Sequence, residues 1–224
     1  MRAGSNMIQA VVFDLDGTVL DNESQWEEAF RQVAEKFSIT NFQFTKDKWI
    51  HEPGIGLERN WLKITEGDVE TARKLAAETK VKYVSSVADN GLGLRDGVVE
   101  VVEKVKERGW RTALATSSLW HVVERELEEL SLQLAFDVTV AGDEVLLPKP
   151  DPEIYTLTAQ KLGREPADCL VIEDAVAGVR SAVEAGCLVV ALASDYAPEK
   201  LLKAAGANYV ARGVGGIIDI LNIL

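Results

Sequence analysis

The chain has 224 residues, of which 47% are hydrophobic and 27% charged, proportions typical of a globular protein with one sizeable core. Its formal net charge of −12 disfavours nucleic acid and anionic membrane surfaces as partners, because like charges repel. No apolar stretch approaches the ~20 residues that a membrane-spanning helix needs. The two cysteines, Cys169 and Cys187, fit neither a zinc knuckle nor a redox pair, so we expect free thiols and a cytoplasmic protein.

The first predicted element is a strand over Ile8–Leu15, a short run rich in β-branched residues that is typical of a strand buried on both faces. The segment that follows it, residues 21–92, shows no convincing strand pattern. It carries three amphipathic helical patterns instead, at Ser24–Phe37, Ile55–Ile64 and Gly67–Ala88. We therefore predict an all-helical cap over residues 21–92, inserted after the first strand.

From residue 93 onward, predicted helices and strands alternate. The helices are expected at Gly97–Arg108, His121–Leu130, Pro152–Leu162 and Ala175–Ala185, and the strands at Thr112–Ala115, Val138–Ala141, Leu170–Ile172 and Leu188–Leu192. Such alternation predicts an α/β fold with a doubly wound parallel sheet, similar to the Rossmann architecture. Residues 1–20 and 93–224 would form this core.

Two carboxylates follow the first predicted strand, in the segment Asp14-Leu15-Asp16-Gly17-Thr18. The carboxyl ends of parallel strands are where open α/β sheets bind ligands. Two acids this close repel each other, and a hard cation such as Mg²⁺ would relieve the repulsion. A plain Asp–Gly turn in which Asp16 caps a helix is the alternative for this segment alone.

Three further motifs follow later predicted strands. They are the hydroxyl run Thr116-Ser117-Ser118, the lysine Lys149 between two prolines, and the acidic pair Glu173-Asp174. Taken singly, each has a plain explanation as a helix cap or a surface turn. Taken together, they would meet at one edge of the sheet. Acids that hold a cation, hydroxyls and a lysine that hold an anion, and a nucleophilic carboxylate indicate phosphoryl transfer.

These four motifs, in this order, resemble those of the haloacid-dehalogenase superfamily, and the resemblance covers nearly the whole chain. The inserted helical segment resembles the caps of the branch that contains phosphoglycolate phosphatase and β-phosphoglucomutase. The resemblance implies a magnesium-dependent phosphatase that hydrolyses a small phosphorylated metabolite, with a sugar phosphate as one candidate. The expected oligomeric state is a monomer or a weak homodimer.

The resemblance also implies roles for individual residues. Asp14 would be the nucleophile that forms an aspartyl-phosphate, and Asp16 would be the general acid and then the general base. Mg²⁺ would bind to Asp14, the carbonyl of Asp16 and Asp174, with Glu173 in its outer shell. Thr116 and the amide of Ser117 would bind the phosphoryl oxygens, and Lys149 would bind phosphate and balance charge.

Two alternatives to hydrolysis stay open. A phosphomutase of the β-phosphoglucomutase type is one, although such enzymes carry a histidine near the position of Trp26. A catalytically silent binding module is the other. The cap loop His51–Arg59 is the expected specificity element, with Gly56 and Arg59 as candidate substrate contacts and a plain surface arginine as the alternative for Arg59.

Overall fold

The computed structural model of the protein describes residues 7–39 and 52–224. Within these residues, six parallel strands form one sheet in the order β3-β2-β1-β4-β5-β6. The strands are β1 (Ala10–Phe13), β2 (Arg111–Ala115), β3 (Val138–Val140), β4 (Cys169–Glu173), β5 (Leu188–Leu192) and β6 (Tyr209–Ala211). Phe13 of β1 pairs with Leu114 of β2 on one side and with Ile172 of β4 on the other. The carboxyl ends of these three strands therefore meet at one edge of the sheet.

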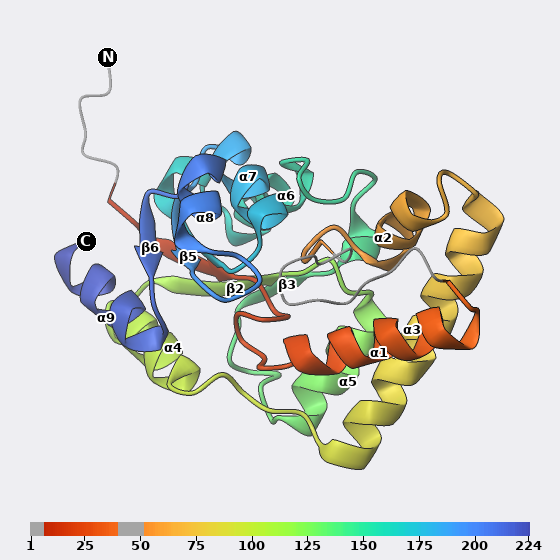
Figure 1. Ribbon diagram of the computed structural model, residues 1–224. Coiled ribbons are helices and arrows are strands. Elements are labelled where there is room, and N and C mark those ends of the chain that lie inside the picture. Colours follow the sequence, from red (N-terminus) through yellow and green to blue (C-terminus); the bar gives the residue numbers. More distant parts are fainter. Residues whose placement is uncertain (1–6, 40–51) are drawn as a thin grey trace.

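Helices cover both faces of the sheet (Figure 1). One face carries α4 (Val98–Glu107), α5 (Trp120–Glu129) and α9 (Val214–Ile223), and the other carries α6 (Glu153–Leu162), α7 (Val176–Ala185) and α8 (Glu199–Ala205). Successive β1 side chains point to opposite faces, so Val11 and Phe13 join one hydrophobic cluster and Ala10 and Val12 join the other. The predicted doubly wound α/β fold is confirmed.

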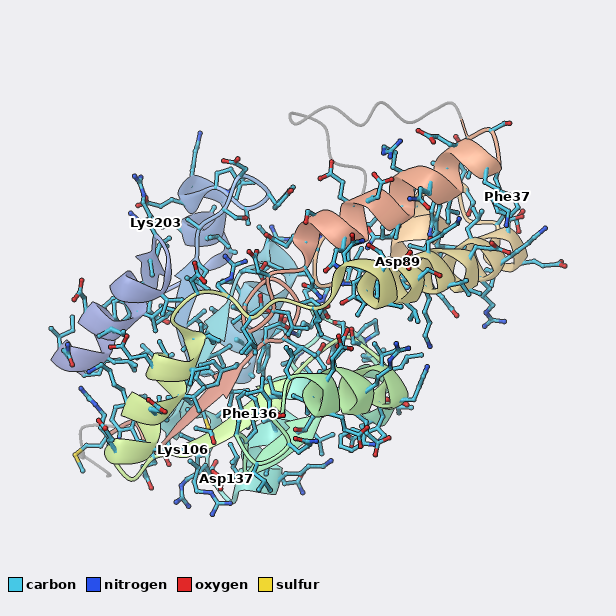
Figure 2. All side chains as sticks on the ribbon, turned by 90° about the horizontal axis from the view of Figure 1, so that it is seen from below. Phe37, Asp89, Lys106, Phe136, Asp137 and Lys203 are labelled. Atoms are coloured by element: carbon cyan, nitrogen blue, oxygen red, sulfur yellow. The ribbon has the colours of Figure 1, made fainter. Side chains whose placement is uncertain are left out.

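In the described residues of the segment after β1, the regular elements are helices, as predicted for the cap. They are α1 (Glu23–Lys36), α2 (Leu57–Ile64) and α3 (Val69–Asn90), which bury a separate hydrophobic cluster that includes Phe30, Trp61 and Leu75. Figure 2 shows α1 and α3 side by side, with Phe37 at the end farthest from Phe136. The limits of core and cap, residues 1–20, 21–92 and 93–224, stay predictions. His51, the first residue of the predicted specificity loop, lies outside the described residues.

Three elements near the carboxyl terminus, β6, α8 and α9, escape prediction from the sequence. β6 and α8 are short, with three and seven residues. The apolar helix α9 contains Gly215 and Gly216 in its first turn, and glycine weakens a helical pattern. Among the described residues, no helix combines the length and the apolar character needed to cross a bilayer.

The buried Trp61 anchors the cap cluster and generates a stability prediction. Its ring lies 5.2 Å from that of Phe30, and its Nε1 donates a hydrogen bond to Thr79 Oγ1 at 2.8 Å. We expect Trp61→Ala to lower the free energy of unfolding by about 3–5 kcal/mol, because it leaves a large cavity. Urea denaturation measures this, with the exposed Val81→Ala on α3 as the control, expected to stay within about 0.5 kcal/mol of the parent. A Trp61→Ala loss as small as that of the control would contradict the prediction.

Candidate active site

A buried ammonium group lies at the carboxyl edge of the sheet. Lys149 Nζ lies 2.6 Å from Asp14 Oδ1 and 2.8 Å from Glu173 Oε1, and it also donates to the carbonyl of Ala115 at 3.1 Å. Its three N–H donors are thus all used. Burial lowers the pKa of Lys149, but Asp14 and Glu173 outweigh burial and hold that pKa well above its ordinary value. Lys149 therefore carries a positive charge next to Asp14, as expected of a residue that balances charge.

The contacts of Lys149 bear on two predicted roles. A phosphoryl oxygen that binds to Lys149 would have to replace one of its three acceptors, so direct phosphate binding by this residue stays a prediction. Glu173 is fully buried and accepts hydrogen bonds from Tyr155 Oη at 3.0 Å and from the amide of Ala175 at 2.7 Å. These contacts orient Glu173 toward Lys149, and its role in the outer shell of a metal stays a prediction as well.

Two carboxyl groups lie beside Gly17, and a third, that of Asp14, acts electrostatically on one of them. Asp14 follows β1, Asp174 follows β4, and Glu23 begins α1. A Cβ on Gly17, whose φ is +78°, would lie 2.1 Å from Asp174 Oδ2 and 3.2 Å from Glu23 Oε1. Only glycine fits here, since a side chain would enter the space between the carboxylates and the positive φ would strain it. Glu23 belongs to the site although the sequence motifs do not indicate it.

The electrostatics of these carboxyls indicate a site for a cation. Burial raises the pKa of Asp14 to about 8, with Lys149 opposing and Glu173 reinforcing the shift. Burial, then Glu173 and Glu23, raise the pKa of Asp174 well above its ordinary value, and burial also raises that of Glu23. Glu23 Oε1 is buried without a hydrogen-bond donor among the described residues. Carboxylate oxygens are the donors that Mg²⁺ prefers, so the chemistry of these residues fits the predicted metal, although no three of them are arranged as a metal-binding cluster in the described part of the chain.

Asp16 lies two residues beyond Asp14 and its carboxyl is held by three donors. Trp26 Nε1 and Asn22 Nδ2 donate to Asp16 Oδ1 at 2.8 and 2.7 Å, and Ser118 Oγ donates to Oδ2 at 2.8 Å. The correspondence of Trp26 with the histidine of a mutase of this branch stays a prediction. None of these donors is assigned to Asp16 by the sequence, because they come from separate elements that only the fold brings together.

The hydroxyl run after β2 lies beside these acids. Thr116 is fully buried, and its Oγ1 accepts a hydrogen bond from the amide of Ser118 at 3.0 Å. Ser117 Oγ donates to the carbonyl of Gly54 at 2.7 Å, which joins the core to the cap loop. Thr116 and Ser117 both border the cavity that core and cap share. Phosphate binding by these two residues stays a prediction.

One cavity of about 720 Å³ joins the predicted residues of core and cap. Asp14, Asp16 and Asp174 line it from the core, and Gly56 and Arg59 line it from the cap. The Arg59 guanidinium also donates a hydrogen bond to the carbonyl of Lys149 at 3.2 Å. The structure therefore brings the nucleophile candidate, the acids and the cap residues to the same space, and substrate contact by Gly56 and Arg59 stays a prediction.

Gly178, in the first turn of α7, allows a test of how closely the backbone packs against the Glu173 carboxylate. A Cβ at this position would lie 1.5 Å from Glu173 Oε1, so Gly178→Ala must displace the Glu173 carboxylate from Lys149. We expect a loss of about 1–3 kcal/mol in the free energy of unfolding, measured by urea denaturation. Gly215→Ala in α9 is the matched control, since nothing lies within 4 Å of its Cβ, and it should be neutral or stabilising. If the two variants were equally stable, the Glu173 carboxylate could move aside without cost, and the prediction would be contradicted.

Comparison with known proteins places this arrangement among phosphatases. The chain is 36% identical over 186 residues to a phosphorylated carbohydrates phosphatase of Thermotoga maritima, covering 80% of this chain and 82% of the relative. It is 30% identical over 184 residues to hexitol phosphatase A of Escherichia coli, covering 81% of each chain. A crystal structure of a hydrolase from Pseudomonas syringae superimposes with a TM-score of 0.83 at 25% identity, over 96% of this chain and 99% of that one.

The family assignment rests on a match to a family model. Residues 8–186, which include β1 with its two acids, the hydroxyl run, Lys149 and the acidic pair after β4, match the model of the haloacid dehalogenase-like hydrolase family. The chain therefore belongs to the haloacid dehalogenase-like hydrolases, and it is a phosphoric monoester hydrolase.

Proposed function

We propose that this protein hydrolyses small phosphorylated carbohydrates with Mg²⁺ and passes through an aspartyl-phosphate at Asp14. The observation that carries the proposal is the position of the Asp14 carboxyl. It lies in hydrogen-bond contact with the buried ammonium of Lys149, close enough to the buried Asp174 to raise the pKa of that acid, and it lines the shared cavity. A carboxyl with positive charge on one side and a cation site on the other is set up to attack a phosphorus atom.

The first step transfers the phosphoryl group to the protein. An oxygen of the ionised Asp14 attacks phosphorus, the ester P–O bond breaks, and the leaving alkoxide takes a proton from Asp16. Even with Lys149 beside it, Asp14 has a pKa raised to about 8, chiefly by burial, so additional positive charge is needed to ionise it at neutral pH. Asp14, Asp174 and the backbone carbonyl of Asp16 would hold Mg²⁺, which supplies that charge and neutralises the phosphoryl oxygens.

The second step releases phosphate. Asp16, now ionised, takes a proton from a water molecule while the water oxygen attacks phosphorus, and the bond between phosphorus and Asp14 breaks. Thr116 and the amide of Ser117 would bind the phosphoryl oxygens through both steps. Asp16 is suited to both proton transfers because its carboxyl lines the cavity and its two oxygens are oriented by donors on different elements.

The carbohydrate assignment draws on the cavity and on the relatives. The cavity is lined mostly by apolar side chains, with a few polar groups that can exchange hydrogen bonds with hydroxyls, among them Arg59 and Lys80. Two relatives of 36% and 30% identity are named for phosphorylated carbohydrates and for hexitol phosphates. Sugar and sugar-alcohol phosphates are accordingly the compounds to test first.

The function is tested by a Mg²⁺-dependent assay of phosphate release against a panel of sugar and hexitol phosphates. We expect turnover of one or more of them, and we expect Asp14→Asn to lower kcat on the order of 10³-fold or more, since it removes the nucleophile. The exposed Asp219→Asn, which makes the same chemical change on α9, should leave kcat unchanged. Phosphorus NMR on the same mixtures detects isomerised sugar phosphate. Isomerisation without phosphate release would contradict hydrolysis in favour of a mutase, and an active Asp14→Asn would contradict the aspartyl-phosphate.

Metal binding should depend on pH in a defined direction. The pKa of Asp14 is raised to about 8 and those of Asp174 and Glu23 are also raised, so protons compete with Mg²⁺ for these carboxylates. A carboxyl whose pKa is raised by folding stabilises the metal-free fold at low pH. This contribution to the free energy of unfolding is lost as pH rises toward 8. We therefore expect Mg²⁺ to bind more tightly as pH rises from 6 to 8, by up to about tenfold per pH unit for each proton displaced.

Calorimetric titration of the protein with Mg²⁺ at several pH values measures this change in affinity. Asp174→Asn should weaken binding at every pH, whereas Asp219→Asn should not. Chelation with EDTA should stop turnover, and added Mg²⁺ should restore it. An affinity that stays constant between pH 6 and 8 would show that these carboxyls do not exchange protons for the metal.

A further inference from the structure

We propose that Tyr83 of the cap and Glu126 of the core are positioning residues for Asp16. In this proposal, the hydrogen bond between them fixes Trp26 and Asn22, which in turn orient the carboxyl that moves protons during catalysis. The inference rests on the proposed function, because it concerns the proton-transfer step of that reaction. It adds two residues, each on a different helix, that share no sequence motif with Asp16.

The donors on Asp16 are themselves fixed by Tyr83. Asn22 is fully buried; its side-chain oxygen accepts from the amide of Gly17 at 3.2 Å, and its Nδ2 donates both to Asp16 Oδ1 and to Tyr83 Oη, each at 2.7 Å. The ring of Trp26 stacks on that of Tyr83, with centroids 3.6 Å apart and planes 2° from parallel. Both groups that donate to Asp16 Oδ1 therefore contact the same tyrosine, one through its hydroxyl and one through its ring.

Tyr83 in turn is held by the core. It is buried in α3, with 1% of its surface exposed, and its hydroxyl donates to Glu126 Oε1 of α5 at 2.9 Å. Helix α3 belongs to the cap insert and α5 packs on the sheet, so this bond crosses from one to the other (Figure 1). The path from Glu126 to Asp16 is continuous through hydrogen bonds by way of Tyr83 and Asn22.

Burying the Glu126 carboxyl costs free energy, and packing does not explain why a glutamate occupies this position. It lies on the buried face of α5 beside Val123 and Leu127, with 4% of its surface exposed. Its Oε2 has no hydrogen-bond partner within the described structure, and burial together with the charge of Asp16 raises its pKa to about 8. An apolar residue would suit this position better on packing grounds. The tyrosine hydroxyl is the one partner that the described residues offer Glu126, which indicates that this carboxyl is there for that bond.

Orientation matters at Asp16 because proton transfer is sensitive to geometry. A displacement of about 1 Å at a reacting group can cost about 10²-fold in rate. Proton donation matters most when the leaving group is a poor one, such as the alkoxide of a sugar, and least when it is a stable anion such as p-nitrophenolate. A residue that only stabilises the fold would affect both substrates alike, so the ratio of the two rates reports on Asp16.

The test compares kcat/KM for p-nitrophenyl phosphate with kcat/KM for the best carbohydrate phosphate of the panel, both with Mg²⁺. Tyr83→Phe keeps the stacked ring and removes the hydroxyl. We expect it to lower kcat/KM for the carbohydrate phosphate about tenfold or more and that for the aryl phosphate less than about threefold. Glu126→Leu should do the same, whereas Glu126→Gln, which keeps an acceptor for the tyrosine, should restore most of the ratio.

The chain offers a matched control on the same helix. Thr79 lies four residues before Tyr83, is fully buried, and accepts the hydrogen bond of Trp61 within the cap. Thr79→Val removes an equally buried cap hydrogen bond that is not connected to Asp16, so the ratio of the two kcat/KM values should not change. In the double variant Tyr83→Phe/Glu126→Leu, the loss should be close to that of either single variant, because both remove the same bond.

The proposal would be overturned if Tyr83→Phe had the same ratio of the two kcat/KM values as the parent. It would also be overturned if Thr79→Val changed this ratio as much as Tyr83→Phe does. These outcomes differ from a failure of the proposed function, in which the parent protein itself releases no phosphate from either substrate or in which Asp14→Asn stays active. In that case the positioning role fails together with the reaction that it serves.

Discussion

The buried contact between Lys149 and Asp14, which is an ion pair once Asp14 is ionised, is the interaction on which the site depends. The lysine side chain is completely excluded from solvent, and removing one partner from such a pair leaves a buried charge at a cost of about 3–5 kcal/mol. Lys149 contacts the carboxylates of Asp14 and Glu173, and the charges of these two acids in turn act on Asp174. Burial is the largest cause of the raised carboxyl pKa values, and the charges of neighbouring acids add to it, which suits the site to a divalent cation.

The parallel sheet is what makes this concentration of charge possible. Because β1 pairs with β2 and β4 in register, the residues that follow the three strands emerge at one edge without any long connection. The space beside the backbone at two glycines then limits how closely the acids can pack. Gly17 leaves room between two carboxylates, and Gly178 leaves room for Glu173 against α7. At both positions, the methyl group of an alanine would collide with a carboxylate oxygen.

Much of this architecture can be predicted from the sequence, and the part that cannot has a common physical origin. Apolar runs and helical periodicity indicate β1 to β5 and α1 to α7, because each element carries its own pattern. The acids and Lys149 are predictable because they follow those strands. The surroundings of Asp16 are not, since Trp26, Tyr83 and Glu126 lie on three helices whose relative placement is a tertiary property. A local signal does exist for Glu126: it stands three residues after Val123 and one before Leu127, where the helical period calls for an apolar residue.

The contacts that close the cap loop over the core end on the catalytic segments themselves. Gly54 accepts from Ser117, and Arg59 donates to the backbone of Lys149. If the cap loop selects the substrate as proposed, selectivity and turnover are linked through these two contacts. A change in the loop that admits a new substrate would then also shift the anchors of the hydroxyl run and of the buried lysine, and with them the speed of the chemistry. Divergence of the family toward new substrates would then require compensating changes on both sides of the cleft, in the loop and at the sheet edge together.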